Sequence, residues 1–180
     1  MKPRLTLIAA LSADGFISRA QGVPWDLPKD KAHFRTYTSG KWLLLGRKTY
    51  DEMRGWFRDH HPLVMTRDAG FSPEIGQRVS SVREALRLAG DAGQDEVVVC
   101  GGAQIYAEAM PYAHELILTH VDHILGAGLS FPKIHPQEWM PVARECHAQD
   151  AAHAFSFEIC TWHRIAAQNP PIEVMDRLAA

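Results

Sequence analysis

The stretch that decides the fold runs from Glu96 to Met110 and reads EVVVCGGAQIYAEAM. Its first part, residues 96–100, is short, apolar and rich in β-branched valine, which predicts a strand covered on both faces. Gly101 and Gly102 let the backbone approach a ligand closely, and residues 103–110 are predicted to form a helix. Taken alone, the pattern is better explained as a tight strand-to-helix turn, because it lacks the G-x-G-x-x-G spacing of dinucleotide-binding loops.

The same succession of strand and helix repeats along the chain. Further strands are predicted over residues 5–11, 41–46, 62–66 and 116–121, and near residues 142–147 and 154–162. Helices are predicted over residues 29–38, 47–53 and 82–89, the last capped by Ser81 with Glu84 three residues later. This alternation predicts a single α/β domain with a mainly parallel, twisted sheet of about eight strands, an antiparallel C-terminal edge and about four flanking helices.

Composition excludes several classes of function. The chain has 180 residues, a net charge of -2 and no run of like charges, so no surface for nucleic acid is expected. The apolar start, residues 5–11, is interrupted by Asp14 and Gly15, and no stretch is long enough to span a membrane. Three widely spaced cysteines argue against a disulfide framework. We expect a cytoplasmic protein, and a monomer.

Ten histidines raise the question of a metal site. His120 and Asp122 share a strand face, and His60 and His61 are neighbours, but no set of ligands recurs with metal spacing. We therefore predict no metal.

One carboxylate stands out. On the helix predicted over residues 29–38, Asp30, Phe34 and Tyr37 are spaced i, i+4 and i+7 and share one face. An acid beside aromatic rings on a face that should be buried is unusual, because an unpaired buried charge is expensive. Two interpretations remain open: an acid in water that compensates the helix dipole, or the single acid of a ligand pocket.

Basic and hydroxyl side chains follow two other predicted strands. Gly46, Arg47, Lys48 and Thr49 stand where a strand passes into a helix, a place that suits phosphate groups. Thr66 and Arg67 end the next strand and could grip a phosphate or lie in a solvated loop. Each signal is weak alone.

Together these segments resemble the dihydrofolate reductase family. The resemblance extends over about residues 5–164 and is carried by LIAA (7–10), PWDLP (24–28), GRKT (46–49), GGAQIY (101–106) and LTHVD (118–122), in the correct order and spacing. It implies a dihydrofolate reductase-like domain over residues 1–164. Residues 165–180 are expected to form a C-terminal tail or a short docked helix.

The resemblance implies a reaction. An NADPH-dependent enzyme of this family reduces 7,8-dihydrofolate to 5,6,7,8-tetrahydrofolate for one-carbon metabolism. Hydride passes from the nicotinamide C4 to C6 of the substrate, and N5 gains a proton through water. Antifolate inhibitors are expected to bind the substrate site. The catalytic residues implied are Asp30, which pairs with the pterin N3 and 2-amino group, Thr119, which holds Asp30, and Trp25, which organises water.

The resemblance also implies two binding sets. The substrate set is Ile8, Ala10, Leu27, Asp30, Lys31, Phe34, Met53, Phe57, His60, Cys100, Tyr106 and Thr119. The cofactor set is Ala10, Ile17, Gly46, Arg47, Lys48, Thr49, Thr66, Arg67, Cys100, Gly101, Gly102, Ala103, Gln104, Ile105 and Tyr106. In the family the bond between the two glycines is cis, and the positions of Arg47, Thr66 and Arg67 point to a 2′-phosphate, hence NADPH over NADH. Residues 13–24 would close over the nicotinamide.

The chain departs from the family at several positions. His60 stands where the family has an arginine whose guanidinium makes a two-point contact with the carboxylate of the substrate's glutamate. Arg58 is a candidate to make that contact instead. Lys31 stands where the family usually has an apolar residue. Our hypothesis is that its ammonium binds the glutamate carboxylate and so partly replaces the missing arginine contact. The loop at residues 126–132 lacks the family's latching aspartate, and Ser18 replaces a glycine.

Two alternative functions stay open. The first is a reductase of the same fold that acts on another pterin or on a riboflavin-pathway pyrimidine, which the change at His60 favours. The second is a non-catalytic folate or nucleotide binder, against which the joint presence of Asp30, Trp25 and Thr119 speaks.

Overall fold

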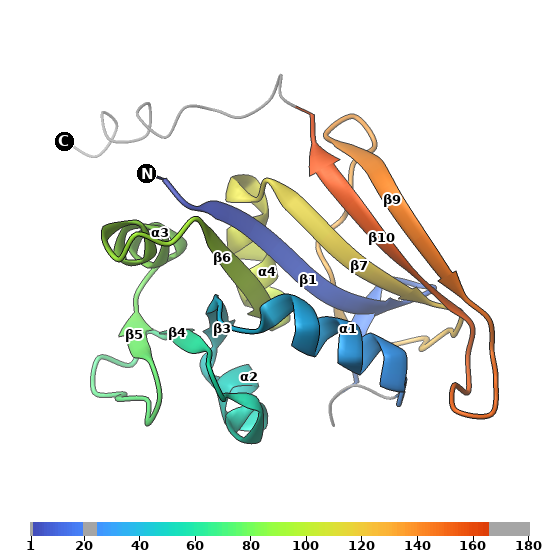
Figure 1. The fold of residues 1–180 in the computed structure, drawn as a ribbon, viewed down its shortest axis with the longest axis horizontal. Helices are drawn as coiled ribbons and strands as arrows, with labels where there is room; N and C mark the ends of the chain where they lie inside the picture. Colours follow the sequence, from blue (N-terminus) through green and yellow to red (C-terminus); the bar gives the residue numbers. More distant parts are fainter. Residues whose placement is uncertain (1, 20–24, 166–180) are drawn as a thin grey trace.

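Eight strands form one twisted sheet through the middle of the molecule (Figure 1). The computed structural model describes residues 2–19 and 25–165. In order across the sheet the strands are β5 (Gln77–Val79), β4 (His61–Met65), β3 (Trp42–Gly46), β6 (Glu96–Gly101), β1 (Arg4–Ser12), β7 (Glu115–Val121), β10 (Phe157–Arg164) and β9 (Trp139–His147). The predicted α/β class and mainly parallel sheet are confirmed.

All neighbouring pairs from β5 to β7 are parallel, and β10 runs antiparallel to both β7 and β9. The predicted antiparallel C-terminal edge is therefore confirmed. Two short strands outside this sheet, β2 (Phe16–Ser18) and β8 (Leu129–Ser130), pair with each other. They were not predicted, because strands of three and two residues are too short to show an alternating pattern.

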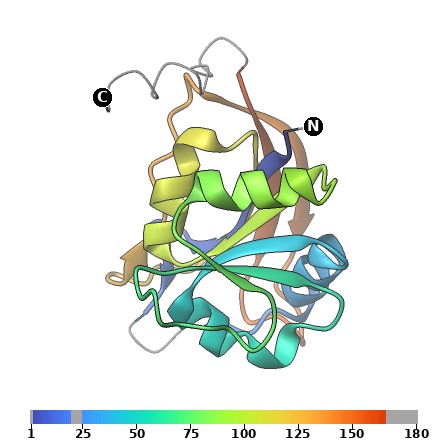
Figure 2. The same ribbon diagram turned by 90° about the vertical axis from the view of Figure 1, so that its left-hand side faces the viewer.

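Four α-helices of the described residues cover the sheet, and they were predicted close to their observed bounds. They are α1 (Pro28–Thr38), α2 (Arg47–Glu52), α3 (Val82–Asp91) and α4 (Ala103–Ala109), with short 3₁₀ turns at Arg54–Trp56 and Met110–Tyr112. Figure 2 shows α3 and α4 along one side of the sheet, and Figure 1 shows α1 in front of the other. No helix in the described ranges is long and apolar enough to cross a membrane.

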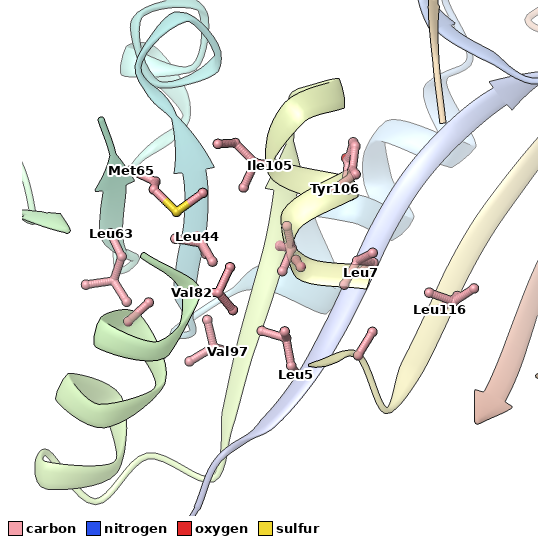
Figure 3. Close-up of a cluster of buried hydrophobic side chains, with 14 of the residues drawn as sticks. Leu5, Leu7, Leu44, Leu63, Met65, Val82, Val97, Ile105, Tyr106 and Leu116 are labelled. Atoms are coloured by element: carbon pink, nitrogen blue, oxygen red, sulfur yellow. The ribbon is translucent and has the colours of Figure 1, made fainter. Parts of the chain in front are cut away.

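Alternation along the central strands builds two hydrophobic clusters. In β6, Val97 and Val99 belong to the cluster beneath α3 and α4, whereas Val98 and Cys100 belong to the cluster on the α1 side. Figure 3 shows the first cluster, in which strand side chains such as Leu5 point toward the two helices. Both faces of the central strands are thus buried, which explains their nearly continuous apolar sequence.

Local signals set the ends of several elements. The Ser81 hydroxyl accepts a hydrogen bond from the Glu84 N–H at 3.1 Å, so the predicted cap of α3 is confirmed. Strand β10 begins at Phe157, later than predicted, because Asp150 folds the preceding residues into a turn by accepting from the N–H groups of Ala152 and His153. The tail or docked helix expected beyond residue 165 lies outside the described residues.

Candidate active site

A cleft of about 760 Å³ opens at the carboxyl ends of the parallel strands. Ligands of open α/β sheets bind at this edge, where strand-to-helix turns converge. The lining residues come from β1, β3, β4 and β6, from α2 and α4, from the β2–β8 pair and from the loops that follow β4, β5 and β6. They are Ala9, Ala10, Ile17, Ser18, Gly46, Arg47, Lys48, Thr49, Glu52, Met65, Thr66, Arg67, Asp68, Ser80, Cys100, Gly102, Ala103, Gln104, Ile105, Tyr106, Glu108 and Leu129.

The cleft gathers the whole predicted cofactor set except Gly101, which lies buried beneath it. Gly101 has a φ of +109°, and a Cβ there would stand 3.0 Å from the ring of Tyr106. The peptide bond between Gly101 and Gly102 is cis, as the resemblance implied. Glycine is therefore required at Gly101 by both conformation and space.

Two further glycines of the cleft, Gly46 and Gly102, lie close to side chains of the neighbouring turn. A Cβ on Gly46 would lie 3.1 Å from Ile105 Cγ1, and one on Gly102 would lie 3.5 Å from Thr49 Oγ1. The turn from β3 to α2 thus packs closely on Ile105, whereas a Cβ on Gly102 would make only an ordinary contact with Thr49.

Most of the predicted substrate set lies on the α1 side of the sheet. Ile8, Leu27, Phe57 and Cys100 are buried in one cluster, and the half-buried Ala10, Phe34 and Met53 pack against it. Ala10 and Cys100 also line the cleft, so this apolar patch and the cleft share a border. The Ile8 carbonyl, expected at the pterin rim, accepts a hydrogen bond from the Tyr106 hydroxyl at 2.6 Å.

Asp30 stands beside this patch, in the first turn of α1. The Thr119 hydroxyl, from the buried strand β7, donates a hydrogen bond to Asp30 Oδ1 at 2.6 Å. Burial raises the pKa of the Asp30 carboxyl above its ordinary value, and the hydrogen bond from Thr119 together with nearby His33 and Lys31 partly opposes this rise. The structure therefore brings together an acid and its hydroxyl partner that are 89 residues apart in the sequence.

Trp25 lies in the same apolar cluster and is 8% exposed. Its indole Nε1–H is buried and has no hydrogen-bond acceptor within the described part of the chain. Buried N–H groups normally find a partner, so this one is suited to a water or a ligand atom.

The helix that carries Asp30 is capped from a distant loop. No side chain of the residue preceding α1 caps it, and instead the Lys29 N–H donates to His153 Nε2 at 3.2 Å. The other ring nitrogen of His153 lies 2.7 Å from Asp150 Oδ1, which identifies it as the protonated one. His153 is 3% exposed and fixes the start of α1.

His60 has no free N–H for the substrate tail. Its side chain is 7% exposed, and its Nδ1 accepts from the Arg58 N–H at 3.2 Å. The ring proton is therefore assigned to Nε2, 3.3 Å from the Thr38 hydroxyl, which itself donates to the Phe34 carbonyl at 2.8 Å. Both nitrogens of His60 are thus used inside the protein, unlike those of the arginine that it replaces.

Lys31 is also engaged, but at the surface. Its ammonium lies 2.8 Å from Asp26 Oδ1, and both side chains are largely exposed. Ion pairs of this kind are weak and exchange readily, so Lys31 remains available to another carboxylate.

Hydrogen bonds to Asp14 hold the segments around β2 and β8, which form one wall of the cleft. This carboxylate accepts hydrogen bonds from the Ser12 hydroxyl at 2.6 Å and from the N–H groups of Leu125 and Gly126 at 3.0 and 2.7 Å. The hydrogen bond from Ser12, supported by those from the two backbone groups, lowers the pKa of Asp14 to about 2. Asp14 thereby ties the segment before β2 to the segment before β8, and this strand pair brings Ile17 and Leu129 to the cleft.

Gly128 permits the close approach of these two segments. Its φ is +158°, and a Cβ there would lie 2.2 Å from the Ser18 carbonyl oxygen. A larger residue would therefore clash with Ser18, and the two segments are joined by the pairing of β2 with β8 and by the hydrogen bonds to Asp14. Sequence reasoning missed Asp14, although Asp14–Gly15 is a typical turn dipeptide.

The sheet order, the two covered faces and the cleft define a class: α/β proteins that bind an elongated ligand at the carboxyl edge of a mainly parallel sheet. The family model described as dihydrofolate reductase matches residues 4–164. Since that match covers most of the chain, the protein belongs to the dihydrofolate reductase family.

Known proteins of the family align over most of their own length. The chain is 32% identical to dihydrofolate reductase type 3 of Salmonella typhimurium, over 89% of this chain and 98% of that protein. It is 35% identical to the dihydrofolate reductase of Neisseria gonorrhoeae, over 78% and 86%. The solved dihydrofolate reductase of Enterococcus faecalis, complexed with NADP(H) and RAB-propyl, superposes with a TM-score of 0.81 at 27% identity, over 89% of this chain and 96% of that one.

Proposed function

We propose that this protein catalyses the NADPH-dependent reduction of 7,8-dihydrofolate to 5,6,7,8-tetrahydrofolate, and so supplies one-carbon metabolism in the cytoplasm. The observation that carries the proposal is the half-buried Asp30 carboxylate. It is held by Thr119 at 2.6 Å, beside an apolar patch that borders the cleft.

The cleft suits a dinucleotide cofactor. Its volume of about 760 Å³ is within the range of small-molecule sites, and Gly46 and Gly102 leave room for close backbone contact. Arg47, Lys48 and Arg67 supply positive charge for phosphate groups at one end. When bound, NADPH supplies the hydride that is transferred from its nicotinamide C4 to C6 of the substrate.

Asp30 would orient the substrate. Because Thr119 occupies Oδ1, the remaining lone pairs of the carboxylate can accept from the pterin N3–H and 2-amino group, a charge-assisted two-point contact. Phe34, Met53 and Phe57 would hold the benzoyl group by apolar contact. The negative charge of Asp30 also favours the substrate form protonated at N5.

Trp25 would position the water molecule that carries the proton. Asp30 would contact the N3 side of the pterin, as in the family, which is too far from N5 for direct transfer, so water would carry the proton. The Trp25 indole N–H, which has no acceptor among the described residues, can hold such a water in place.

The proposal is tested by mixing the purified protein with NADPH and dihydrofolate. We expect NADPH consumption, tetrahydrofolate as the product by mass spectrometry, and transfer of deuterium to C6 from NADPH labelled at the transferred C4 position. Tight binding of both ligands without turnover would instead identify a non-catalytic binder. An antifolate that mimics the pterin should compete with dihydrofolate and not with NADPH.

A second candidate, reduction of a pterin without the glutamate tail, is favoured by one observation. Both ring nitrogens of His60 are used within the protein, so the forked carboxylate contact of the family is absent. Competing dihydrofolate with a dihydropterin that lacks the tail separates the two candidates. A clear preference for the tailless compound would support the second.

A further inference from the structure

At the end of the cleft that contains Arg47 and Arg67, the carboxylate of Asp68 lies beside the Arg47 guanidinium. The guanidinium of Arg47, the first residue of α2, lies 3.1 Å from Asp68 Oδ2 and 4.7 Å from the centroid of the Phe71 ring. Asp68 lines the cleft together with Arg47, Thr66 and Arg67. Arg47 is therefore held between an acid and an aromatic face.

A tight turn fixes Asp68 in this position. The Phe71 N–H donates to the Asp68 carbonyl at 3.2 Å, and the Gly70 N–H donates to Asp68 Oδ1 at 3.0 Å. The Asp68 N–H donates to Thr66 Oγ1 at 3.2 Å, which leaves the Thr66 hydroxyl proton for another acceptor. The turn thus places the carboxylate beside Arg47, where its side chain remains about half exposed.

The charges that line the cleft balance each other. The three cations Arg47, Lys48 and Arg67 are matched by the three acids Glu52, Asp68 and Glu108. Attraction for a phosphate at any one point therefore depends on the nearest groups rather than on an overall positive field. At Arg47 the nearest charged group is the Asp68 carboxylate.

We propose that Asp68 sets the preference between NADPH and NADH, by competing with the 2′-phosphate of NADPH for Arg47. This inference rests on the proposed function. Both partners of the Arg47–Asp68 pair are about half exposed, with side-chain exposures of 51% and 53%, so a phosphate can replace the carboxylate but meets its repulsion. The ribose hydroxyl of NADH meets no such repulsion and can donate to a carboxylate.

Asp68→Asn removes the negative charge of this side chain and keeps its size and shape. Its single amide oxygen can keep the hydrogen bond from the Gly70 N–H, so its NH₂ group takes the place of the oxygen that faces Arg47, while the stack of Arg47 on Phe71 is left in place. We expect the dissociation constant for NADPH to fall about three- to tenfold, the scale of one partly exposed charge interaction, while that for NADH changes less than about twofold. Quenching of tryptophan fluorescence measures both constants without turnover.

Smaller probes locate the effect at the phosphate. Adenosine 2′,5′-bisphosphate should gain affinity in Asp68→Asn as NADPH does, and adenosine 5′-monophosphate should not. The affinity of the variant for NADPH should also fall more steeply with added salt, because its phosphate contact is no longer offset by a fixed negative charge.

A matched control removes a different acid, one that lies on α2, the helix that begins with Arg47. Asp51 pairs with Arg54 at 2.8 Å on the exposed side of α2, and neither residue lines the cleft. Asp51→Asn changes the net charge equally and should leave the ratio of NADPH to NADH affinity unaltered. In an Arg47→Gln background, Asp68→Asn should lose most of its gain.

Several results would overturn the inference. They are weaker or unchanged NADPH binding in Asp68→Asn, an equal gain in Asp51→Asn, or a full gain without Arg47. If the unmodified protein oxidises NADPH with dihydrofolate but Asp68→Asn keeps its cofactor ratio, only the role of Asp68 fails. If the unmodified protein binds neither nucleotide, the proposed function fails with it.

Discussion

Replacing Asp30 with asparagine removes one negative charge and leaves the side-chain shape intact. Thr119 donates to Asp30 Oδ1 at 2.6 Å, so an asparagine that keeps this hydrogen bond places its oxygen toward Thr119. Its NH₂ group then occupies the place of the second carboxylate oxygen. That group would face the N–H donors of a pterin, and a donor would oppose a donor.

The size of the effect follows from this geometry. A hydrogen bond to a charged group contributes roughly 1.5–3 kcal/mol, and the variant loses the charge-assisted contact and gains a mismatch. A loss of about 3–4 kcal/mol corresponds to a fall of about 10²–10³-fold in the rate of hydride transfer. NADPH binding should change little, because Asp30 does not line the cleft.

The assay is single-turnover oxidation of NADPH by dihydrofolate, measured from about pH 5 to pH 9. The rate of the Asp30→Asn variant should recover partly in acid, where the substrate acquires its proton from solvent. Asp91→Asn, at the exposed end of α3, changes the charge equally and should leave the rate within about twofold.

Two results would refute this reasoning. Hydride transfer by Asp30→Asn within about fivefold of the unmodified protein at neutral pH would show that the carboxylate does not act on the substrate. An equal loss at every pH would show that the charge does not assist protonation.

Asp30→Asn should also raise the denaturant midpoint at neutral pH, because burial raises the pKa of Asp30 and its charge is unfavourable in the fold. The gain should shrink as the pH falls through that raised pKa and should vanish below the ordinary pKa of an aspartate, where the folded and unfolded chains are both protonated. Thr119→Val removes a hydrogen bond that lowers the pKa of Asp30, so the acid limb of the pH–rate profile should move to higher pH and the neutral rate should fall about tenfold. Asp14→Asn should weaken NADPH binding about three- to tenfold and leave the affinity for a pterin antifolate unchanged, as measured by titration of each ligand. In the unmodified protein, the stability that Asp14 contributes should be lost as the pH falls from about 4 to about 2, between the ordinary and the lowered pKa of this group. Lys31→Leu should raise the Michaelis constant for dihydrofolate about threefold and not that of a dihydropterin without the glutamate, and an unchanged constant would exclude Lys31 as an anchor.

The helices and seven of the eight strands of the sheet could be predicted from local patterns, whereas the three-residue β5 was not predicted. The run from Leu5 to Leu11 and the valines of β6 are apolar without interruption because both of their faces are covered. Ser81 marks the start of α3 through a contact only three residues long. The cofactor set was implied by the resemblance to the family, and all but one of its members line one cleft because the ends of parallel strands meet at one edge of a sheet.

The contacts that tune the site were not predictable. Asp14 reaches the N–H groups of Leu125 and Gly126, 111 and 112 residues away, and His153 caps α1 from 124 residues away. His60 was expected to face the substrate, but the fold uses both of its nitrogens internally.

The difference has a physical cause. Burial on two faces, helix capping and strand-to-helix turns act between neighbours along the chain, so residue order alone reveals them. The direction of a hydrogen bond, the tautomer of a buried histidine and the partner of Arg47 depend on which atoms lie within about 3 Å after folding. Those atoms come from distant segments, and no local pattern records which of them will meet.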